Sequence, residues 1–177
     1  MEAPLAGRVV VGISATLAGY QALRYAATEA RQRGAPLVAV RVFKPANTVT
    51  GAMWRDTAVE AAHAEVARAF TNALGGIPLD LPVNVHLRSG VPAKKLVATA
   101  DRAEDLLVIG ASGRHPAARL RRAAAAYCAR FAACPVVVVP APALAGAGRR
   151  RLGRAVTRQA EQLLRSARPA SDFTGRP

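Results

Sequence analysis

Short apolar runs alternate along this chain with longer stretches in which apolar residues recur at helical spacing. Each run is five to seven residues long and rich in valine, leucine or isoleucine, which predicts a buried strand. The runs are Val9–Ile13, Leu37–Phe43, Val83–Leu87, Leu106–Gly110 and Pro135–Val139. Most are nearly continuous rather than alternating, a pattern typical of parallel strands that are covered on both faces.

The stretches between these runs predict helices. After the first run, Ser14 and Thr16 are good helix N-caps, and an apolar stripe continues from Leu23 to a stop at Gly34. A second stripe extends from Val59 to Ala73, after a predicted loop at 44–55 that carries the only tryptophan, Trp54. Gly90-Val91-Pro92 opens a short helix that ends near Arg102, and an alanine-rich helix ends near Ala133.

Alternation of strands and helices over about 140 residues predicts a doubly wound α/β domain with a parallel sheet. In such domains the ligand crevice lies at the carboxyl ends of the strands, where the winding direction reverses. Four loops should lie at those ends, namely Gly12–Thr16, Val42–Arg55, Leu87–Pro92 and Gly110–Ala124.

The composition changes after Pro140. We expect the α/β domain at 1–140, a small-residue linker at 141–148, a basic amphipathic helix at 149–168 and a flexible tail at 169–177. In the helix, Leu152, Val156, Ala160, Leu163 and Ala167 share one face, and Arg154, Arg158 and Arg165 surround the other.

Charge adds a class of partner to this picture. The chain has 25 Lys and Arg against 11 Asp and Glu, a net charge of +14, and the residues after Pro140 are the most densely basic. This excess favours anionic partners, but does not choose between nucleotides, nucleic acid and anionic surfaces.

Half the residues are hydrophobic, which excludes a disordered chain. No apolar run approaches the length of a membrane helix and Met1-Glu2-Ala3-Pro4 does not resemble a signal peptide, so we expect a cytoplasmic protein without membrane insertion.

Candidate catalytic chemistry is sparse. Neither standard glycine-rich nucleotide motif is present, and Gly110-Ala-Ser-Gly113 departs from a nucleophile elbow because Arg114 stands where a glycine is required.

We interpret His63 as a partly buried packing residue, His86 as a surface or edge residue and His115 as a solvated loop residue. Cys128 and Cys134 match no metal spacing, which favours a packing role. We therefore expect neither a metal site nor an enzyme, although weak ATP hydrolysis stays open.

From Val9 to Pro140 the layout resembles a universal stress protein of the UspA type. The resemblance rests on Val9-Val-Val-Gly12 with Thr16, Leu37–Val42, Gly90-Val-Pro92, Asp105–Gly113 and Cys134–Val139 in this order. It implies a five-stranded Rossmann-like fold, a role in stress regulation, and a homodimer that pairs the last strand, Pro135–Val139, with its counterpart.

The ATP-binding branch of that family carries the motif G-x2-G-x9-G-[ST], in which glycine N–H groups and a hydroxyl at a helix N-terminus hold phosphates. Gly110 and Gly113 match its first two glycines, whereas Ala123 and Ala124 replace the third glycine and the hydroxyl residue. Ser14 stands where ATP binders usually have aspartate. The remaining candidate binding residues are Gly12, Thr16, Val42, which we place near the adenine, and Arg114.

Two hypotheses for the function follow. In the first, the protein is a stress-response regulator that binds ATP in the crevice, with Mg²⁺ only as a companion of ATP. Four arginines near the fourth strand then either hold the anion or form a solvated basic segment that leads into the helix. They are Arg114, Arg119, Arg121 and Arg122. In the second, the protein is a dimer that acts without nucleotide, and its basic C-terminal helix docks on nucleic acid, an anionic surface or a partner protein.

Overall fold

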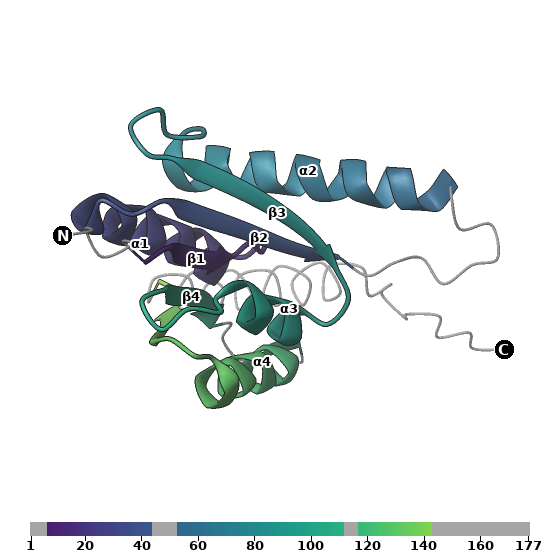
Figure 1. Cartoon of the computed structure of the whole chain (residues 1–177). Coiled ribbons are helices and arrows are strands. Elements are labelled where there is room, and N and C mark those ends of the chain that lie inside the picture. Colours follow the sequence, from purple (N-terminus) through teal and green to yellow (C-terminus); the bar gives the residue numbers. More distant parts are fainter. Residues whose placement is uncertain (1–6, 44–52, 112–116, 143–177) are drawn as a thin grey trace, which may run out of the picture. The chain divides into compact units, whose positions relative to one another are not determined.

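The five apolar runs form one parallel sheet with the strand order β3-β2-β1-β4-β5 (Figure 1). The computed structural model describes residues 7–43, 53–111 and 117–142. Its strands are β1 Val9–Gly12, β2 Leu37–Phe43, β3 Val83–Ser89, β4 Leu106–Ala111 and β5 Val136–Pro140. Its helices are α1 Leu17–Arg33, α2 Met53–Leu74, α3 Pro92–Thr99 and α4 Ala117–Phe131. The predicted α/β fold is therefore confirmed.

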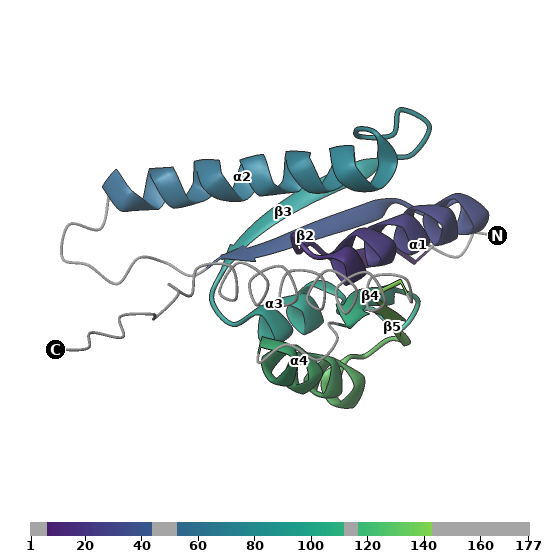
Figure 2. The same ribbon diagram turned by 180° about the vertical axis from the view of Figure 1, so that it is seen from behind.

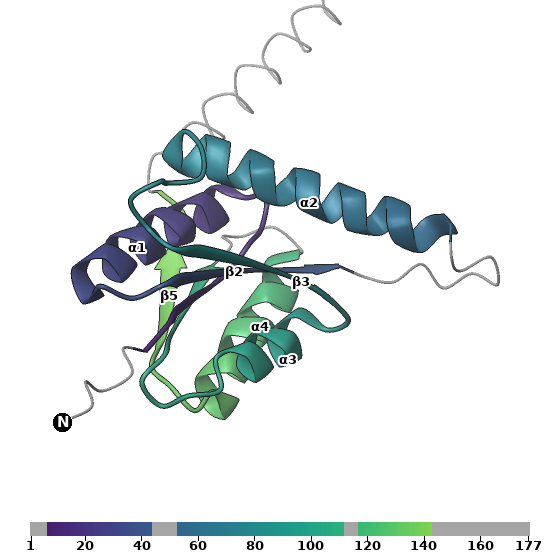
Figure 3. The ribbon, with the colours of Figure 1, turned by 45° about the horizontal axis from the view of Figure 1, so that its top comes forward.

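Helices cover both faces of the sheet, as the continuous apolar runs predicted. Val9 and Val11 in the central strand β1 face the core formed with α1 and α2, whereas Val10 between them faces α3 and α4. All three side chains are fully buried. Figure 3 shows the two helix pairs on opposite sides of the sheet, and Figure 2 shows α2 from behind, alongside β2 and β3.

The ends of α1 follow their sequence signals. The hydroxyl of Thr16 accepts a hydrogen bond from the Gly19 N–H, 3.0 Å away, and so caps the helix start. Gly34 ends the helix in the left-handed region, at φ 60°, where glycine carries no steric penalty.

The start of α2 and the environment of His63 differ from the prediction. The helix begins at Met53, so residues 53–55 of the predicted loop are helical. The buried stripe of α2 contains Ala62, Val66 and Phe70, and His63 is exposed. The packing interpretation of His63 is therefore wrong, because one step from Ala62 turns a side chain by about 100° around the helix.

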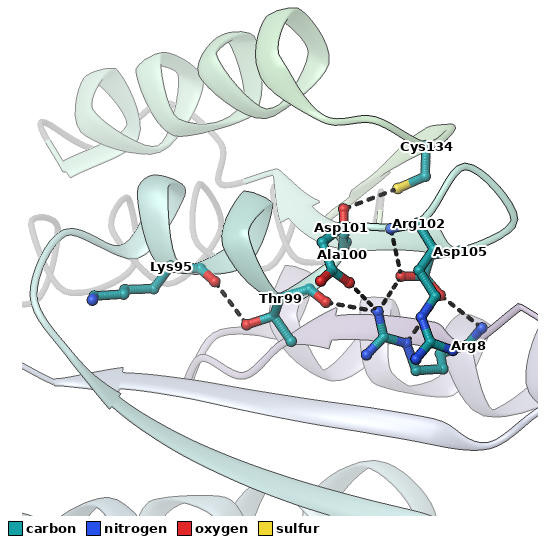
Figure 4. A network of polar contacts seen from close by, with 8 residues as sticks. All are labelled: Arg8, Lys95, Thr99, Ala100, Asp101, Arg102, Asp105 and Cys134. Atoms are coloured by element: carbon teal, nitrogen blue, oxygen red, sulfur yellow. Dashed lines mark hydrogen bonds and ion pairs between the residues drawn. The ribbon is translucent and has the colours of Figure 1, made fainter.

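An ion-pair network joins the amino ends of β1 and β4 (Figure 4). The Asp105 carboxylate is 1% exposed and accepts hydrogen bonds from the Arg8 guanidinium, at 2.5 and 3.0 Å, and from the backbone N–H groups of Arg8 and Arg102. Arg8 also pairs with Asp101 at 2.6 Å. Burial raises the pKa of Asp105, but these hydrogen bonds outweigh burial and hold its pKa below the ordinary value. The network lies at the opposite end of the strands from the predicted crevice, so its role is structural.

Both cysteines pack in the α3–α4 side of the core, as predicted. They are free thiols, and each lies 3.9 Å from a carbonyl oxygen of α3 or its C-cap, Cys128 from Ala93 and Cys134 from Ala100. Burial raises the pKa of Cys128 to about 11, which keeps the thiol protonated and unreactive at neutral pH.

The described residues up to Ala141 belong to one compact unit, which spans Met1–Ala141. The predicted basic helix at 149–168, the tail and most of the linker lie outside the described residues, and their boundaries stay predictions. Among the described helices, none combines the length and apolarity that a bilayer-spanning helix requires.

Candidate functional site

The strand order places the reversal of winding between β1 and β4. These two strands are neighbours, yet the chain leaves β1 toward α1 on one face and leaves β4 toward α4 on the other. Parallel neighbours whose connections diverge in this way leave a crevice at their carboxyl ends. The structure brings the predicted residues Gly12, Ser14, Thr16 and Gly110 to this end of the sheet.

Gly110 lets β4 approach the start of α1 at backbone distance. A Cβ atom at this position would lie 2.6 Å from the carbonyl carbon of Ala18 and 2.8 Å from the backbone nitrogen of Gly19. Any side chain here would collide with the backbone of α1, which cannot move aside as the end of a flexible side chain can. Gly110 therefore sets how closely β4 approaches the start of α1, whether or not its own N–H contacts a ligand.

The loop after β1 is held against α1 in the same way. A Cβ on Gly19 would lie 2.3 Å from the Oγ of Ser14 and 2.4 Å from its carbonyl oxygen. The Ile13 N–H donates to the Val40 carbonyl at 2.9 Å, which fixes the other end of the loop to β2. The loop is thus rigidly placed between two elements of the core.

Two hydroxyl groups line this loop. The Oγ atoms of Ser14 and Thr16 lie 3.1 Å apart and share one hydrogen bond, while Thr16 also accepts from Gly19. Both side chains are half-buried. Because a hydroxyl can donate once and accept twice, Ser14 retains capacity for a bond to a ligand. The first N–H groups of α1 also lack acceptors within the helix, which favours an anion here.

The side chain of Val42, the predicted adenine contact, is largely buried. It is 9% exposed and packs in the core between the sheet and α3. Only a small part of this side chain is therefore accessible to a ligand.

Ala123 and Ala124 lie inside α4 rather than at its start. The helix begins at Ala117, so both positions are beyond the first turn, where N–H groups bond to carbonyls four residues earlier. Ala123 is exposed, and Ala124 packs against the α3–α4 side of the core. Neither offers the free N–H or the hydroxyl that the phosphate motif requires. Gly113 and Arg114 lie outside the described residues, as do the side chains of Arg119, Arg121 and Arg122.

Arg41 is a site residue that the sequence analysis missed. It belongs to β2, forms an ion pair with Glu65 of α2, and its Nη1 donates to the Ile13 carbonyl at 3.4 Å. Arg41 thereby connects α2 to the loop that carries Ser14. The available signal was a charged residue within the otherwise apolar run Leu37–Phe43.

Within residues 7–43, 53–111 and 117–142, no group of three or more His, Cys, Asp or Glu side chains is placed to hold a metal ion. The loop after β1 carries hydroxyl groups where ATP binders of the resembled family carry a carboxylate.

A model of the universal stress protein family matches residues 6–140 of the chain. A universal stress protein solved in complex with cAMP is 23% identical, with a TM-score of 0.57 over 78% of this chain and 100% of that one. A family member from Burkholderia pseudomallei is 20% identical, with a TM-score of 0.56 over 79% and 100%. One from Arabidopsis thaliana, solved with AMP bound, is 16% identical, with a TM-score of 0.54 over 77% and 93%. Among the curated proteins, none matches the chain.

These findings define the class as a universal stress protein-type α/β domain whose winding reverses between β1 and β4. The chain belongs to the universal stress protein family. The structural matches are under 25% identical and support the fold, and the nucleotides named above belong to those relatives.

Proposed function

We propose that this protein is a stress-response regulator that binds an adenine nucleotide in the crevice between β1 and β4. The observation that carries the proposal is the hydroxyl-lined loop of Ser14 and Thr16 at the start of α1, where Thr16 caps the N–H of Gly19. Two relatives solved with cAMP and AMP support an adenine nucleotide as the ligand.

The two sides of the crevice differ in what they offer to phosphates. On the β1 side, Ser14 and the first N–H groups of α1 can receive one phosphate. On the β4 side, Ala123 and Ala124 lie inside the helix and supply no donors. We therefore expect AMP to bind at least as tightly as ATP, because the second and third phosphates gain little from α4. Binding of ATP with Mg²⁺ is part of the proposal, and we propose regulation rather than hydrolysis as its outcome.

Calorimetric titration of the full chain with AMP, cAMP and ATP plus Mg²⁺ tests the proposal. We expect saturable binding of one nucleotide per chain. Ser14→Ala should weaken it roughly tenfold to a hundredfold, because a hydrogen bond to a charged group contributes about 1.5–3 kcal/mol. Thr28→Ala is the matched control, since the Thr28 hydroxyl donates to a carbonyl of the same helix away from the crevice and its loss should leave affinity unchanged.

A second variant separates binding from folding. Leu17 is the first residue of α1 and is 49% exposed. Leu17→Glu adds a negative charge that favours the helix start but repels a phosphate, so stability should hold while affinity falls. Leu17→Gln should bind like the unchanged protein. Flat heats with all three nucleotides, from a protein shown to be folded, would overturn the proposal.

The second candidate function is a nucleotide-independent dimer, which the exposed edge of β5 favours. β5 ends the sheet, so one row of its backbone groups has no partner strand within the described sheet, and Val138 beside it is 42% exposed. Such an edge invites pairing with a second copy. This candidate leaves the basic C-terminal region free to contact an anionic partner.

Size-exclusion chromatography with light scattering tests the dimer. We expect a dimer from the unchanged chain and a monomer from Val138→Lys, because an unpaired lysine at the paired edge opposes association. Val91→Lys is the control, since Val91 is an exposed valine away from β5, at 56% exposure. A monomer from the unchanged chain would contradict pairing through β5.

A further inference from the structure

The connection between β3 and α3 carries an uncompensated group of positive charges. Arg88 near the end of β3, and Lys94 and Lys95 in the first turn of α3, are all exposed. We call these three residues the basic edge. Eight successive residues of the chain hold all three, so the charges are locally dense.

The fold fixes the basic edge at the carboxyl ends of the strands. Arg88 is in register with Val42 of β2, and the Gly90 N–H donates to the Phe43 carbonyl at 3.0 Å. Gly90 has φ 126°, a conformation that favours glycine, and turns the chain into α3. A Cβ on Gly90 would lie 3.2 Å from Cε of Lys95, so the lysine stem extends over this turn. Figure 4 shows Lys95 directed away from the Arg8 network.

No carboxylate neutralises the basic edge within the described part of the chain. Arg8, Arg31, Arg33 and Arg41 each form an ion pair, whereas Arg88, Lys94 and Lys95 form none there. The first turn of α3 contains no acidic residue, and its N-cap, Val91, has no side-chain hydrogen bond. Two lysines therefore lie at the positive end of the helix dipole, an unfavourable arrangement that a bound anion would relieve.

We propose that the basic edge binds the phosphate backbone of double-stranded nucleic acid, without preference for base sequence. A duplex presents one negative charge per about 1.7 Å of its axis, which suits several cations on one short segment. Residues 88–95 contain no aromatic side chain on which an unpaired base could stack or with which the protein could anchor in a membrane interface.

The test compares two triple variants of the full chain that have equal net charge. One is Arg88→Gln, Lys94→Gln, Lys95→Gln, and the matched control is Arg68→Gln, Arg102→Gln, Arg130→Gln. The three control arginines are also exposed and form no ion pair with described residues. Binding to a mixed-sequence 20-base-pair DNA duplex is measured by fluorescence anisotropy between 50 and 200 mM salt, with calorimetric AMP affinity as a second readout.

We expect the first variant to bind DNA about tenfold more weakly or worse at 50 mM salt. The slope of log K against log salt should fall by roughly 2–3, since each lost phosphate contact removes about 0.9. The control should keep the slope of the unchanged chain, and AMP affinity should be the same in all three proteins. Equal losses in both variants would show an effect of net charge alone and overturn the proposal. Unchanged DNA binding in the first variant would also overturn the proposal. So would a first variant that binds vesicles of phosphatidylserine more weakly but binds DNA as well as the unchanged chain.

Discussion

Replacing Asp105 with alanine should lower the free energy of unfolding by about 3–5 kcal/mol, because the change removes one partner of a buried ion pair. The carboxylate is 1% exposed and receives hydrogen bonds from the Arg8 guanidinium and from two backbone N–H groups. Alanine leaves these donors without their acceptor at the junction of β1 and β4. Urea unfolding at pH 7, followed by circular dichroism, measures the loss.

The same residue predicts a dependence on pH. The pKa of Asp105 lies below its ordinary value of 3.8 in the folded protein, because hydrogen bonds outweigh the opposing effect of burial. The contribution of Asp105 to the free energy of unfolding should be complete above its unfolded-state pKa. It should be lost as the pH falls through the lowered folded-state pKa. Asp105→Asn has the same shape without the titrating group, so it should lose less stability than the parent protein on acidification. Equal acid sensitivity in both proteins would contradict this role, as would a loss below 1 kcal/mol for Asp105→Ala.

Replacing Gly110 with alanine should destabilise the domain by about 3 kcal/mol or more, at the upper end of overpacking effects. The added methyl group would lie 2.6 Å from the Ala18 carbonyl carbon, so β4 and α1 must separate. Because that contact lies at the carboxyl end of β4, beside the proposed nucleotide site, nucleotide affinity should fall as well. Urea unfolding and AMP calorimetry measure the two effects on one preparation.

Gly12→Ala is the matched control, since Gly12 ends β1 beside the same crevice. Its new Cβ would lie 3.2 Å from Cδ1 of Leu96, the flexible end of a side chain that can shift. We expect Gly12→Ala to lower the free energy of unfolding by about 1 kcal/mol or less. Similar losses for the two variants would show that the backbone contact at Gly110 is not the constraint we describe.

The arrangement of α4 changes how the family motif should be tested. Ala123→Gly combined with Ala124→Ser restores the motif letters, but both positions lie inside the helix. Glycine there costs about 1 kcal/mol relative to alanine, and the serine replaces a residue that packs on the core. A gain of ATP affinity therefore requires α4 to start later, so restoring the motif letters alone does not restore the site.

The sequence by itself determined the elements and the class of fold. Continuous apolar runs such as Leu37–Phe43 identified buried strands, and Thr16 and Gly34 identified the ends of α1, because caps and strand burial depend on local sequence. The motif pieces from Val9 to Val139 were sufficient to indicate the family. The predicted packing role of His63 was wrong. The helical spacing from Val59 does not determine which residues at the margin of an apolar stripe are buried against the rest of the domain.

Only the tertiary structure decided the composition of the crevice wall. Gly110 resembles a phosphate-binding glycine in sequence, and its close approach to Ala18 is visible only when β4 and α1 are packed together. The link from Arg41 to Ile13 and Glu65 joins three elements that lie far apart in the chain. Ala123 was matched by counting residues from Gly110, but its availability to a phosphate depends on where α4 begins. Local sequence determines which elements form, whereas the distances between them depend on how the side chains and glycines of several elements pack at once.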